Sequence, residues 1–253
     1  MVHELSTQHV AVILGAIPAR WGSTRFPGKP LAEIAGRPLV SWVVEAALDA
    51  RSLDAVVVVT DREEIARVAV AAGARAVVIA REAASGTDRI AHLLAADNSC
   101  AAARIVVNVQ ADEPLLEPAA IDAAVDALER EHEADITTLA RALRPDESAE
   151  DPSVVKVAVS GAGRALYFSR APIPHGLASH VHVGLYAFRR SAFDRFVAAP
   201  PTALEKAERL EQLRALELGL AIRVVPFDSR SIGVDTPADV ARVEALLSEA
   251  SER

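Results

Sequence analysis

Residues 10–30 read VAVILGAIPARWGSTRFPGKP, and this stretch decides the fold. Its first five residues, Val10–Leu14, are all apolar, which predicts a strand that is covered on both faces. The residues that follow are small or polar, and they include Arg20, Arg25 and Lys29. Ligands in open α/β sheets bind beside such loops, at the carboxyl ends of strands. Three cations and exposed backbone N–H groups suit a triphosphate.

The loop differs from two common phosphate-binding loops. It lacks G-x-G-x-x-G, which argues against a dinucleotide site, and it lacks a terminal G-K-[ST], which argues against a P-loop. An ordinary surface loop whose arginines are only solvated would show the same residue types. The attached segment Pro27–Pro30 and the buried strand before it favour the phosphate-binding interpretation.

Further along the chain, apolar runs alternate with helical patterns. Strands are predicted at 55–59, 75–79 and 105–109, and their lack of polar alternation predicts helices on both faces. After about residue 134 the pattern predicts short strands at 135–139, 154–159, 164–168 and 180–188. One long helix is expected over 202–218, with Leu204 inward, then a strand at 222–225 and a last helix opened by Thr236 and Pro237. We therefore expect one α/β domain over residues 1–253, a mostly parallel, Rossmann-like sheet flanked by helices, with a smaller β-rich lobe.

Composition excludes several classes of protein. The 253 residues carry a net charge of -8, and the basic residues are spread out, which argues against a nucleic-acid partner. The single cysteine, Cys100, allows no intrachain disulfide and is expected to be a packed thiol rather than a catalytic one. No apolar run reaches 18 residues, so we expect no membrane span and a cytoplasmic protein.

Several motifs, in order, resemble those of one family, the 3-deoxy-manno-octulosonate (Kdo) cytidylyltransferases, or CMP-Kdo synthetases. They cover nearly the whole chain: 17–20 with 27–31, 85–89, 108–114, 167–174, 210–214 and 233–237. The resemblance implies a nucleotide-diphospho-sugar transferase type of fold. It also implies transfer of CMP from CTP to a small acidic acceptor, with release of pyrophosphate. CTP would bind to about 9–133 and 221–253, and the acceptor and a second subunit to the lobe at 134–220.

On the nucleotide side, the resemblance assigns Arg20, Arg25 and Lys29 to the phosphates and Asp112 and Asp235 to Mg²⁺. Taken alone, the two aspartates are a turn former and a neighbour of a helix cap. The expected nucleotide contacts are Ala19, Ser23, Ser85, Gly86, Thr87 and Arg89, and Ser85 or Thr87 could equally be only a helix N-cap.

On the acceptor side, the resemblance implies contacts from Gln110, Arg170, His182, Tyr186, Glu211 and Gln212. Arg170 could clamp a carboxylate with its forked donors. His180 and His182 could form a zinc pair, although a hydrogen-bonded histidine is the simpler interpretation, and Glu211 could be only a solvent-facing helix residue. Seven residues separate Pro174 from His182, fewer than is typical of the family, and Val181 stands where a cation is common. A smaller acid such as phosphonoformate is therefore an alternative acceptor.

Two competing interpretations place the chain in a different class of protein. A non-catalytic nucleotide-binding module would be expected to have lost Lys29 or an aspartate, and a sugar 1-phosphate nucleotidyltransferase would leave the segment 167–170 unexplained. We also expect a homodimer, from the resemblance and from the apolar strand His180–Phe188.

Overall fold

The computed structural model describes residues 13–22, 26–176 and 180–251. Within these ranges nine strands form one mixed sheet, whose main path runs β11-β7-β10-β6-β1-β4-β5. The strand bounds are β1 (Ile13–Ala19), β4 (Ala55–Thr60), β5 (Arg75–Val78), β6 (Ile105–Asn108), β7 (Ile136–Ala142), β8 (Lys156–Val159), β9 (Ala165–Ser169), β10 (His180–Arg189) and β11 (Ile222–Pro226). Along that path only β10 runs antiparallel to its neighbours. The predicted mostly parallel sheet is confirmed.

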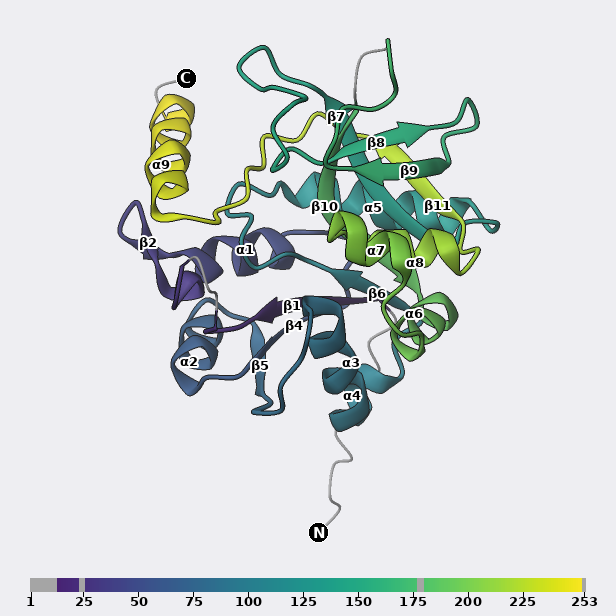
Figure 1. The fold of residues 1–253 in the computed structure, drawn as a ribbon. Coiled ribbons are helices and arrows are strands. Elements are labelled where there is room, and N and C mark those ends of the chain that lie inside the picture. Colours follow the sequence, from purple (N-terminus) through teal and green to yellow (C-terminus); the bar gives the residue numbers. More distant parts are fainter. Residues whose placement is uncertain (1–12, 23–25, 177–179, 252–253) are drawn as a thin grey trace.

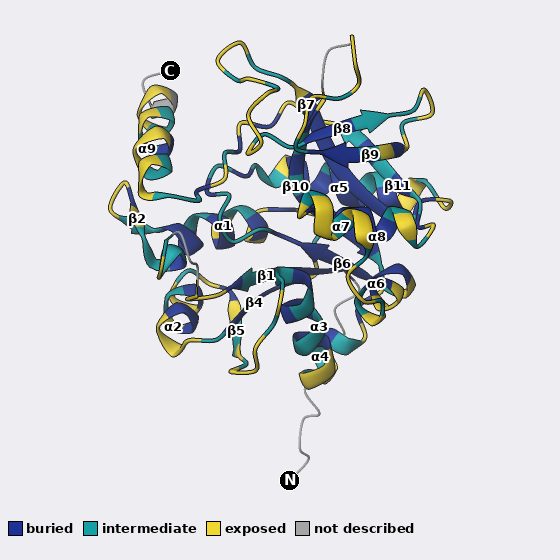
Figure 2. Ribbon diagram, in the orientation of Figure 1, coloured by how far each residue is buried: buried dark blue, intermediate teal, exposed yellow. Residues whose placement is uncertain are grey.

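Helices cover both faces of this sheet, and each face has its own apolar core (Figures 1 and 2). One core packs the face that carries Ile13 and Ile17, and the other packs the face that carries Leu14 and Ala16, as strand alternation requires. The helix bounds are η1 (Lys29–Leu31), α1 (Leu39–Leu48), α2 (Glu63–Ala71), α3 (Gly86–Ala96), α4 (Asn98–Ala101), α5 (Pro118–Arg130), α6 (Arg190–Ala198), α7 (Ala203–Glu208), α8 (Gln212–Glu217) and α9 (Pro237–Ser251).

The β-rich lobe is an extension of this sheet (Figure 1). Strand β10 pairs with β7 from His180 to Phe188, and its other edge pairs with β8 at its start and with β6 through Tyr186–Arg189. The register of β10 against β7 shifts between Val183 and Tyr186. Strand β9 pairs antiparallel with β8. A separate two-stranded hairpin is formed by β2 (Glu33–Ile34) and β3 (Arg37–Pro38). One continuous strand therefore links the part of the sheet around β6 and β1 to the part around β8 and β9.

Three sequence-based expectations about elements are wrong. The helix expected over 202–218 is broken into α7 and α8, because Arg209 adopts a left-handed conformation with φ 55°, and Leu204 is exposed. Strand β1 continues to Ala19, so the loop begins at Arg20 rather than Gly15. Strand β5 lies at the edge of the sheet and exposes Arg75 and Val78, so its faces are not both covered.

The apolar character of β10, which motivated a dimer interface, has an internal cause. Val183, Leu185 and Ala187 pack in one core, and Tyr186 and Phe188 pack in the other. The apolar sequence of β10 is therefore no argument for a dimer interface. Among the described residues, no helix has the length and apolarity to span a membrane.

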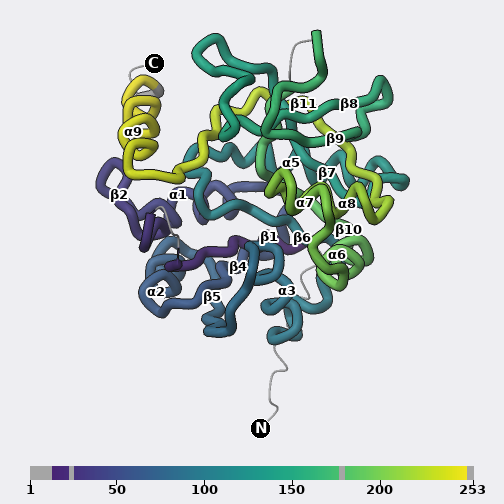
Figure 3. Tube along the Cα trace, viewed as in Figure 1, coloured from purple at the N-terminus to yellow at the C-terminus, as the bar shows by residue number. Residues whose placement is uncertain are grey.

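The C-terminal segment returns to the N-terminal half of the chain. After β11 it crosses the molecule and ends in α9, which lies beside β2 (Figures 1 and 3). The backbone N–H of Ala35 donates to Glu244 Oε1 over 2.8 Å, which ties α9 to this hairpin. This crossing carries Asp235 toward the carboxyl end of β1.

Candidate active site

A polar cleft of about 240 Å³ lies at the carboxyl ends of β1 and β6. These neighbouring parallel strands end at the same edge of the sheet, as expected for a ligand site in such a fold. Three cations reach the cleft from different parts of the sequence. Its lining is Pro18, Arg20, Lys29, Pro30, Ser85, Gly86, Arg89, Gln110, Ala111, Asp112 and Asp235.

Lys29 joins the two predicted metal ligands. Its Nζ lies 2.6 Å from Asp112 Oδ2 and 3.3 Å from Asp235 Oδ1. The backbone N–H of Val234 donates to the Asp112 carbonyl over 2.8 Å, and this bond brings the two aspartates together. Two converging carboxylates suit Mg²⁺, which takes only one or two protein oxygens when phosphates and water complete its shell. Within the described ranges, no group of three or more histidines, cysteines or acidic residues is arranged to hold a metal ion.

The loop before Lys29 is shaped by a glycine and a tryptophan. Gly28 has φ 73°, and a Cβ added there would lie 3.1 Å from the Trp21 ring, so both the backbone conformation and the contact favour glycine. The N–H of Gly28 donates to the Trp21 carbonyl over 3.0 Å, which closes the loop. Arg25 and Ser23 lie outside the described residues, and their predicted roles remain predictions.

The start of α3 forms another wall of the cleft. Ser85 caps the helix: its hydroxyl accepts from the N–H of Asp88, whose side chain accepts from the N–H of Ser85. The capping alternative for Ser85 is thus observed, and Ser85 lines the cleft as well. A Cβ on Gly86 would lie 3.0 Å from Pro18 Cγ, which explains the close approach of α3 to β1.

Arg89 contributes a buried cation to this wall. It is 4% exposed, and its Nη2 lies 3.8 Å from Asp61 Oδ2. Burial lowers the pKa of Arg89; Asp61 opposes this effect and Arg20 adds to it. Two guanidinium groups close enough to repel one another favour an anionic ligand between them.

Two of the residues expected to contact the nucleotide, Ala19 and Thr87, have buried side chains that do not line the cleft. Ala19 is the last, buried residue of β1, so only its backbone could meet a ligand. Thr87 is fully buried and is not part of the cleft lining. Its hydroxyl donates to Glu211 Oε1 over 2.5 Å and accepts from Asn108 Nδ2 over 3.1 Å. In the structure the Thr87 hydroxyl thus bonds to Glu211 and Asn108, and its expected contact with the nucleotide stays a prediction.

His182 and Tyr186 form an aromatic wall in the lobe. The ring centroids of His182 and Tyr186 lie 5.3 Å apart, and Phe168 packs edge-on to His182 at 5.2 Å. Thr138 directs its hydroxyl to the Leu185 carbonyl over 2.8 Å, so His182 donates from Nε2 to Thr138 Oγ1 over 2.9 Å. Burial lowers the pKa of His182 to about 3. Burial also raises the pKa of Tyr186, and the carboxylates of Glu211 and Glu113 add to that rise.

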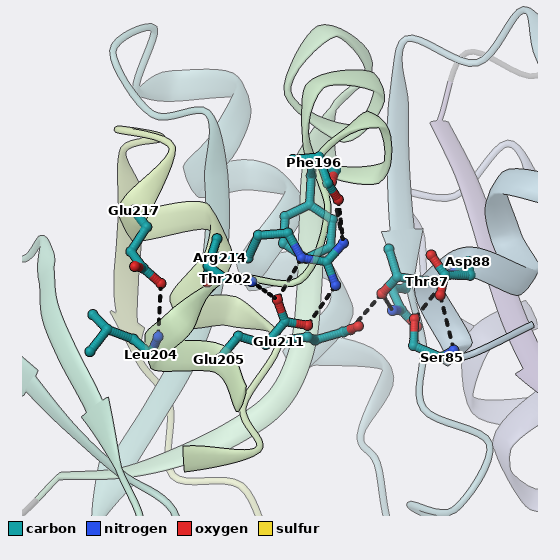
Figure 4. A network of polar contacts seen from close by, with 12 residues as sticks. Ser85, Thr87, Asp88, Phe196, Thr202, Leu204, Glu205, Glu211, Arg214 and Glu217 are labelled. Atoms are coloured by element: carbon teal, nitrogen blue, oxygen red, sulfur yellow. Dashed lines mark hydrogen bonds and ion pairs between the residues drawn. The ribbon is translucent and has the colours of Figure 1, made fainter. Parts of the chain in front are cut away.

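Glu211 and Gln212 stand at the break between α7 and α8, and Figure 4 shows Glu211 beside Thr87. With Tyr186 they line a cavity of only about 10 Å³, which is too small for a sugar acid, so these three predicted acceptor residues lie together without forming an open pocket. Burial raises the pKa of Glu211, against the hydrogen bond from Thr87. The second oxygen, Oε2, is buried and has no hydrogen-bond partner. Glu211 is thus an interior carboxylate, and the solvent-face alternative is excluded.

Arg170 uses most of its donors within the protein. Its guanidinium donates to the carbonyls of Pro152, Glu208 and Arg209, at 2.7, 2.9 and 3.3 Å. The predicted clamp on a carboxylate stays a prediction, and it would require some of these bonds to be exchanged. A larger cavity of about 690 Å³ lies where the segment 159–163 meets β7, β11 and His180, and it contains none of the predicted nucleotide, metal or acceptor residues.

Sequence reasoning missed Asn108 and Glu113 as members of the site. Asn108 is fully buried at the end of β6, and a polar residue in an apolar strand was the available signal. Glu113 accepts from Ser231 Oγ over 2.8 Å, and burial raises its pKa to about 7 against that bond. A Cβ on Gly184 would lie 2.9 Å from Glu113 Oε1, which explains the glycine in β10.

Comparison with known proteins agrees with this geometry. A family model described as cytidylyltransferase matches residues 14–222. A 3-deoxy-manno-octulosonate cytidylyltransferase of Anaeromyxobacter dehalogenans strain 2CP-1 is 50% identical over 247 residues, which cover 95% of this chain and 98% of the relative. One from Bdellovibrio bacteriovorus is 43% identical over 246 residues, covering 93% and 98%. A solved structure of a CMP:2-keto-3-deoxy-manno-octonic acid synthetase complexed with CTP superimposes with a TM-score of 0.86 at 36% identity, covering 94% of this chain and 99% of that one.

The sheet, the cleft at its strand ends and these similarities define a nucleotidyltransferase enzyme. More narrowly, the chain belongs to the 3-deoxy-manno-octulosonate cytidylyltransferase family, within the cytidylyltransferases.

Proposed function

We propose that this enzyme transfers CMP from CTP to Kdo and releases pyrophosphate. The observation that carries the proposal is the placement of Lys29 between Asp112 and Asp235, in a cleft that Arg20 and Arg89 also line. A hydroxyl oxygen of Kdo forms a bond to the α-phosphorus, the bond from that phosphorus to pyrophosphate breaks, and the hydroxyl proton passes to solvent. No side-chain nucleophile is needed, because positioning and charge stabilisation supply most of the catalysis in such transfers.

Within this proposal, different residues of the cleft bind the phosphates, the metal ion and the nucleoside. Arg20 and Lys29 stabilise the phosphates, with Arg25 as a further predicted contributor, and the α3 N-terminus adds backbone donors. Asp112 and Asp235 would hold Mg²⁺, which supplies charge neutralisation to the phosphates when bound. Ser85 and Gly86 stand where a nucleoside would meet α3. CTP thus occupies the cleft at the end of β1, and the acceptor approaches from Tyr186 and Glu211.

Kdo is proposed as the acceptor because the relatives described above act on that acid by name, at up to half identity over nearly the whole chain. No contact among the described residues favours phosphonoformate. The shortened segment that suggested it lies partly at 177–179, outside the described residues.

The test measures pyrophosphate release with MgCl₂, comparing CTP with ATP and Kdo with phosphonoformate. We expect release to require CTP and Kdo together, with kcat/KM at least about 10²-fold higher for Kdo, about 2.7 kcal/mol of discrimination. Equal turnover with ATP would overturn the cytidine assignment, and a preference for phosphonoformate would overturn the acceptor.

A further inference from the structure

Four side chains form one chain of hydrogen bonds between the cleft and the acceptor lobe. Gln110 Nε2 donates to Asn108 Oδ1 over 3.3 Å, and Asn108 Nδ2 donates to Thr87 Oγ1 over 3.1 Å. Thr87 Oγ1 in turn donates to Glu211 Oε1 over 2.5 Å. Figure 4 shows Thr87 and Glu211 facing one another across this last bond. The series therefore joins a residue of the nucleotide cleft to the buried carboxylate of the lobe.

Hydrogen-bonding chemistry gives this series one direction. Thr87 donates the single proton of its hydroxyl to Glu211 Oε1, so that hydroxyl has only lone pairs left for Asn108. The lone pairs of that hydroxyl then accept the Asn108 amide N–H, and the Asn108 carbonyl oxygen faces Gln110. Gln110 therefore donates its side-chain N–H to this oxygen, and its own carbonyl oxygen points away from Asn108. The bond from Thr87 to Glu211 thus sets which end of Gln110 is offered to a ligand.

The members of the series are held by rigid elements. Asn108 is fully buried in β6, which pairs with a neighbour on each side. Thr87 lies in the first turn of α3, behind the capping box of Ser85. At the other end, Arg214 fixes the start of α8 by donating to both oxygens of Glu205, at 2.6 and 2.8 Å (Figure 4). A change at Thr87 should therefore alter orientation rather than loosen the surroundings.

We propose that Thr87 is a positioning residue for the acceptor: it orients Glu211 directly and the amide of Gln110 through Asn108, and it touches neither substrate. The ligand contact that depends on it is to an acceptor hydroxyl, which can donate to the carbonyl oxygen of Gln110, a residue that lines the open cleft. This assignment rests on the proposed function. It predicts that loss of the Thr87 hydroxyl weakens the use of Kdo far more than the use of CTP.

The experiment compares Thr87→Val, Thr87→Ala and Thr87→Ser in steady-state pyrophosphate release, varying Kdo at saturating CTP and then CTP at saturating Kdo. Valine and alanine should raise KM for Kdo about tenfold or more, the scale of a lost bond to a charged group, and leave KM for CTP within about twofold. Serine keeps the hydroxyl and should restore KM for Kdo to within about threefold. If valine does not fold, alanine gives the same readout without a new methyl group.

Thr137→Val is the matched control. Thr137 is equally buried, and its hydroxyl donates to the Ala124 carbonyl over 2.7 Å, away from this series. It should leave both KM values unchanged while thermal unfolding reports any loss of stability. The proposal would be overturned if Thr87→Val and Thr87→Ala raised the KM values for Kdo and CTP equally, or raised neither. It would also be overturned if Thr87→Ser failed to restore the KM for Kdo, or if Thr137→Val raised the KM for Kdo alone. If the wild-type enzyme shows no Kdo-dependent release, the proposed function fails first and this assignment fails with it.

Discussion

At the scale of single residues, Lys29 contacts the carboxylates of Asp112 and Asp235 and is the proposed partner of the CTP phosphates. Its ammonium lies between Asp112 and Asp235, so the fold itself brings three charges of the cleft together. Preorganised charge of this kind costs little reorganisation during the reaction, which is the usual source of large electrostatic effects in enzymes. Lys29 is partly buried, and its position is fixed by the left-handed Gly28 beside it.

Lys29→Ala should therefore lower kcat by about 10²–10³-fold, the scale for removing one preorganised stabilising group. The same assay on Lys206→Ala, an exposed lysine of α7, should show a change within about twofold. Circular dichroism of both variants reports folding. Activity of a folded Lys29→Ala enzyme within about twofold of wild type would show that the phosphates bind elsewhere.

His182 makes stability depend on pH. Its folded pKa of about 3 lies below its ordinary value of 6.5, so below pH 6.5 the unfolded chain takes up a proton that the folded chain does not. Folding stability therefore falls as the pH drops from 6.5 toward 3, by about 2 kcal/mol between pH 7.5 and pH 5. His182→Gln cannot titrate and retains an N–H for Thr138, so it should lose about 2 kcal/mol less over that interval. Urea unfolding at the two pH values measures the difference, and equal losses would contradict a buried neutral histidine.

At the scale of elements, the break between α7 and α8 places Glu211 in the interior. A continuous helix over 202–218 would continue past Arg209 without the left-handed turn that ends α7. The turn is held from both sides, because Arg170 Nη2 donates to the Arg209 carbonyl over 3.3 Å and Arg214 binds Glu205. Non-glycine residues adopt this conformation at a cost of about 1–2 kcal/mol, and glycine is the usual residue at such a helix end.

Arg209→Gly should therefore leave the free energy of unfolding unchanged within about 0.5 kcal/mol or raise it. Arg209→Val, with a β-branched side chain, should lower it by about 1–2 kcal/mol. Chemical denaturation of the two variants beside wild type provides the measurement. A valine variant as stable as wild type would show that the turn is not held left-handed in solution.

This break also shows where sequence patterns stop being informative. The strands at 55–59 and 105–109 were predictable because their apolar runs match the requirement of a sheet covered on both faces. Arg209 carries no helix-ending signal, since arginine is a good helix former, and the leucine spacing continues through it. Thr87 and Glu211 lie 124 residues apart, and local pattern cannot reveal that the hydroxyl of one is used by the other. The meeting of Asp112 and Asp235 was expected only through the family resemblance.

At the scale of the whole molecule, the homodimer remains a prediction from that resemblance, since the apolar strand β10 is explained by the two cores. Light scattering at micromolar concentration should give twice the chain mass of 26.8 kDa. A mass equal to one chain across that range would contradict it. Kdo-dependent activity measured at the same concentrations would show whether a monomer suffices for catalysis.

The bond from Val234 to Asp112 has a consequence for how the enzyme is made. Roughly 120 residues separate Asp112 from Asp235. At a synthesis rate of about 5–20 residues per second, Asp235 is therefore translated about 6–25 s after Asp112. During that interval β1, β4, β5 and β6 have been translated, but the pair of carboxylates around Lys29 cannot form. A nascent chain on the ribosome therefore offers a nucleotide no complete site, and catalytic competence arrives only when the crossing toward α9 has been translated and has folded back.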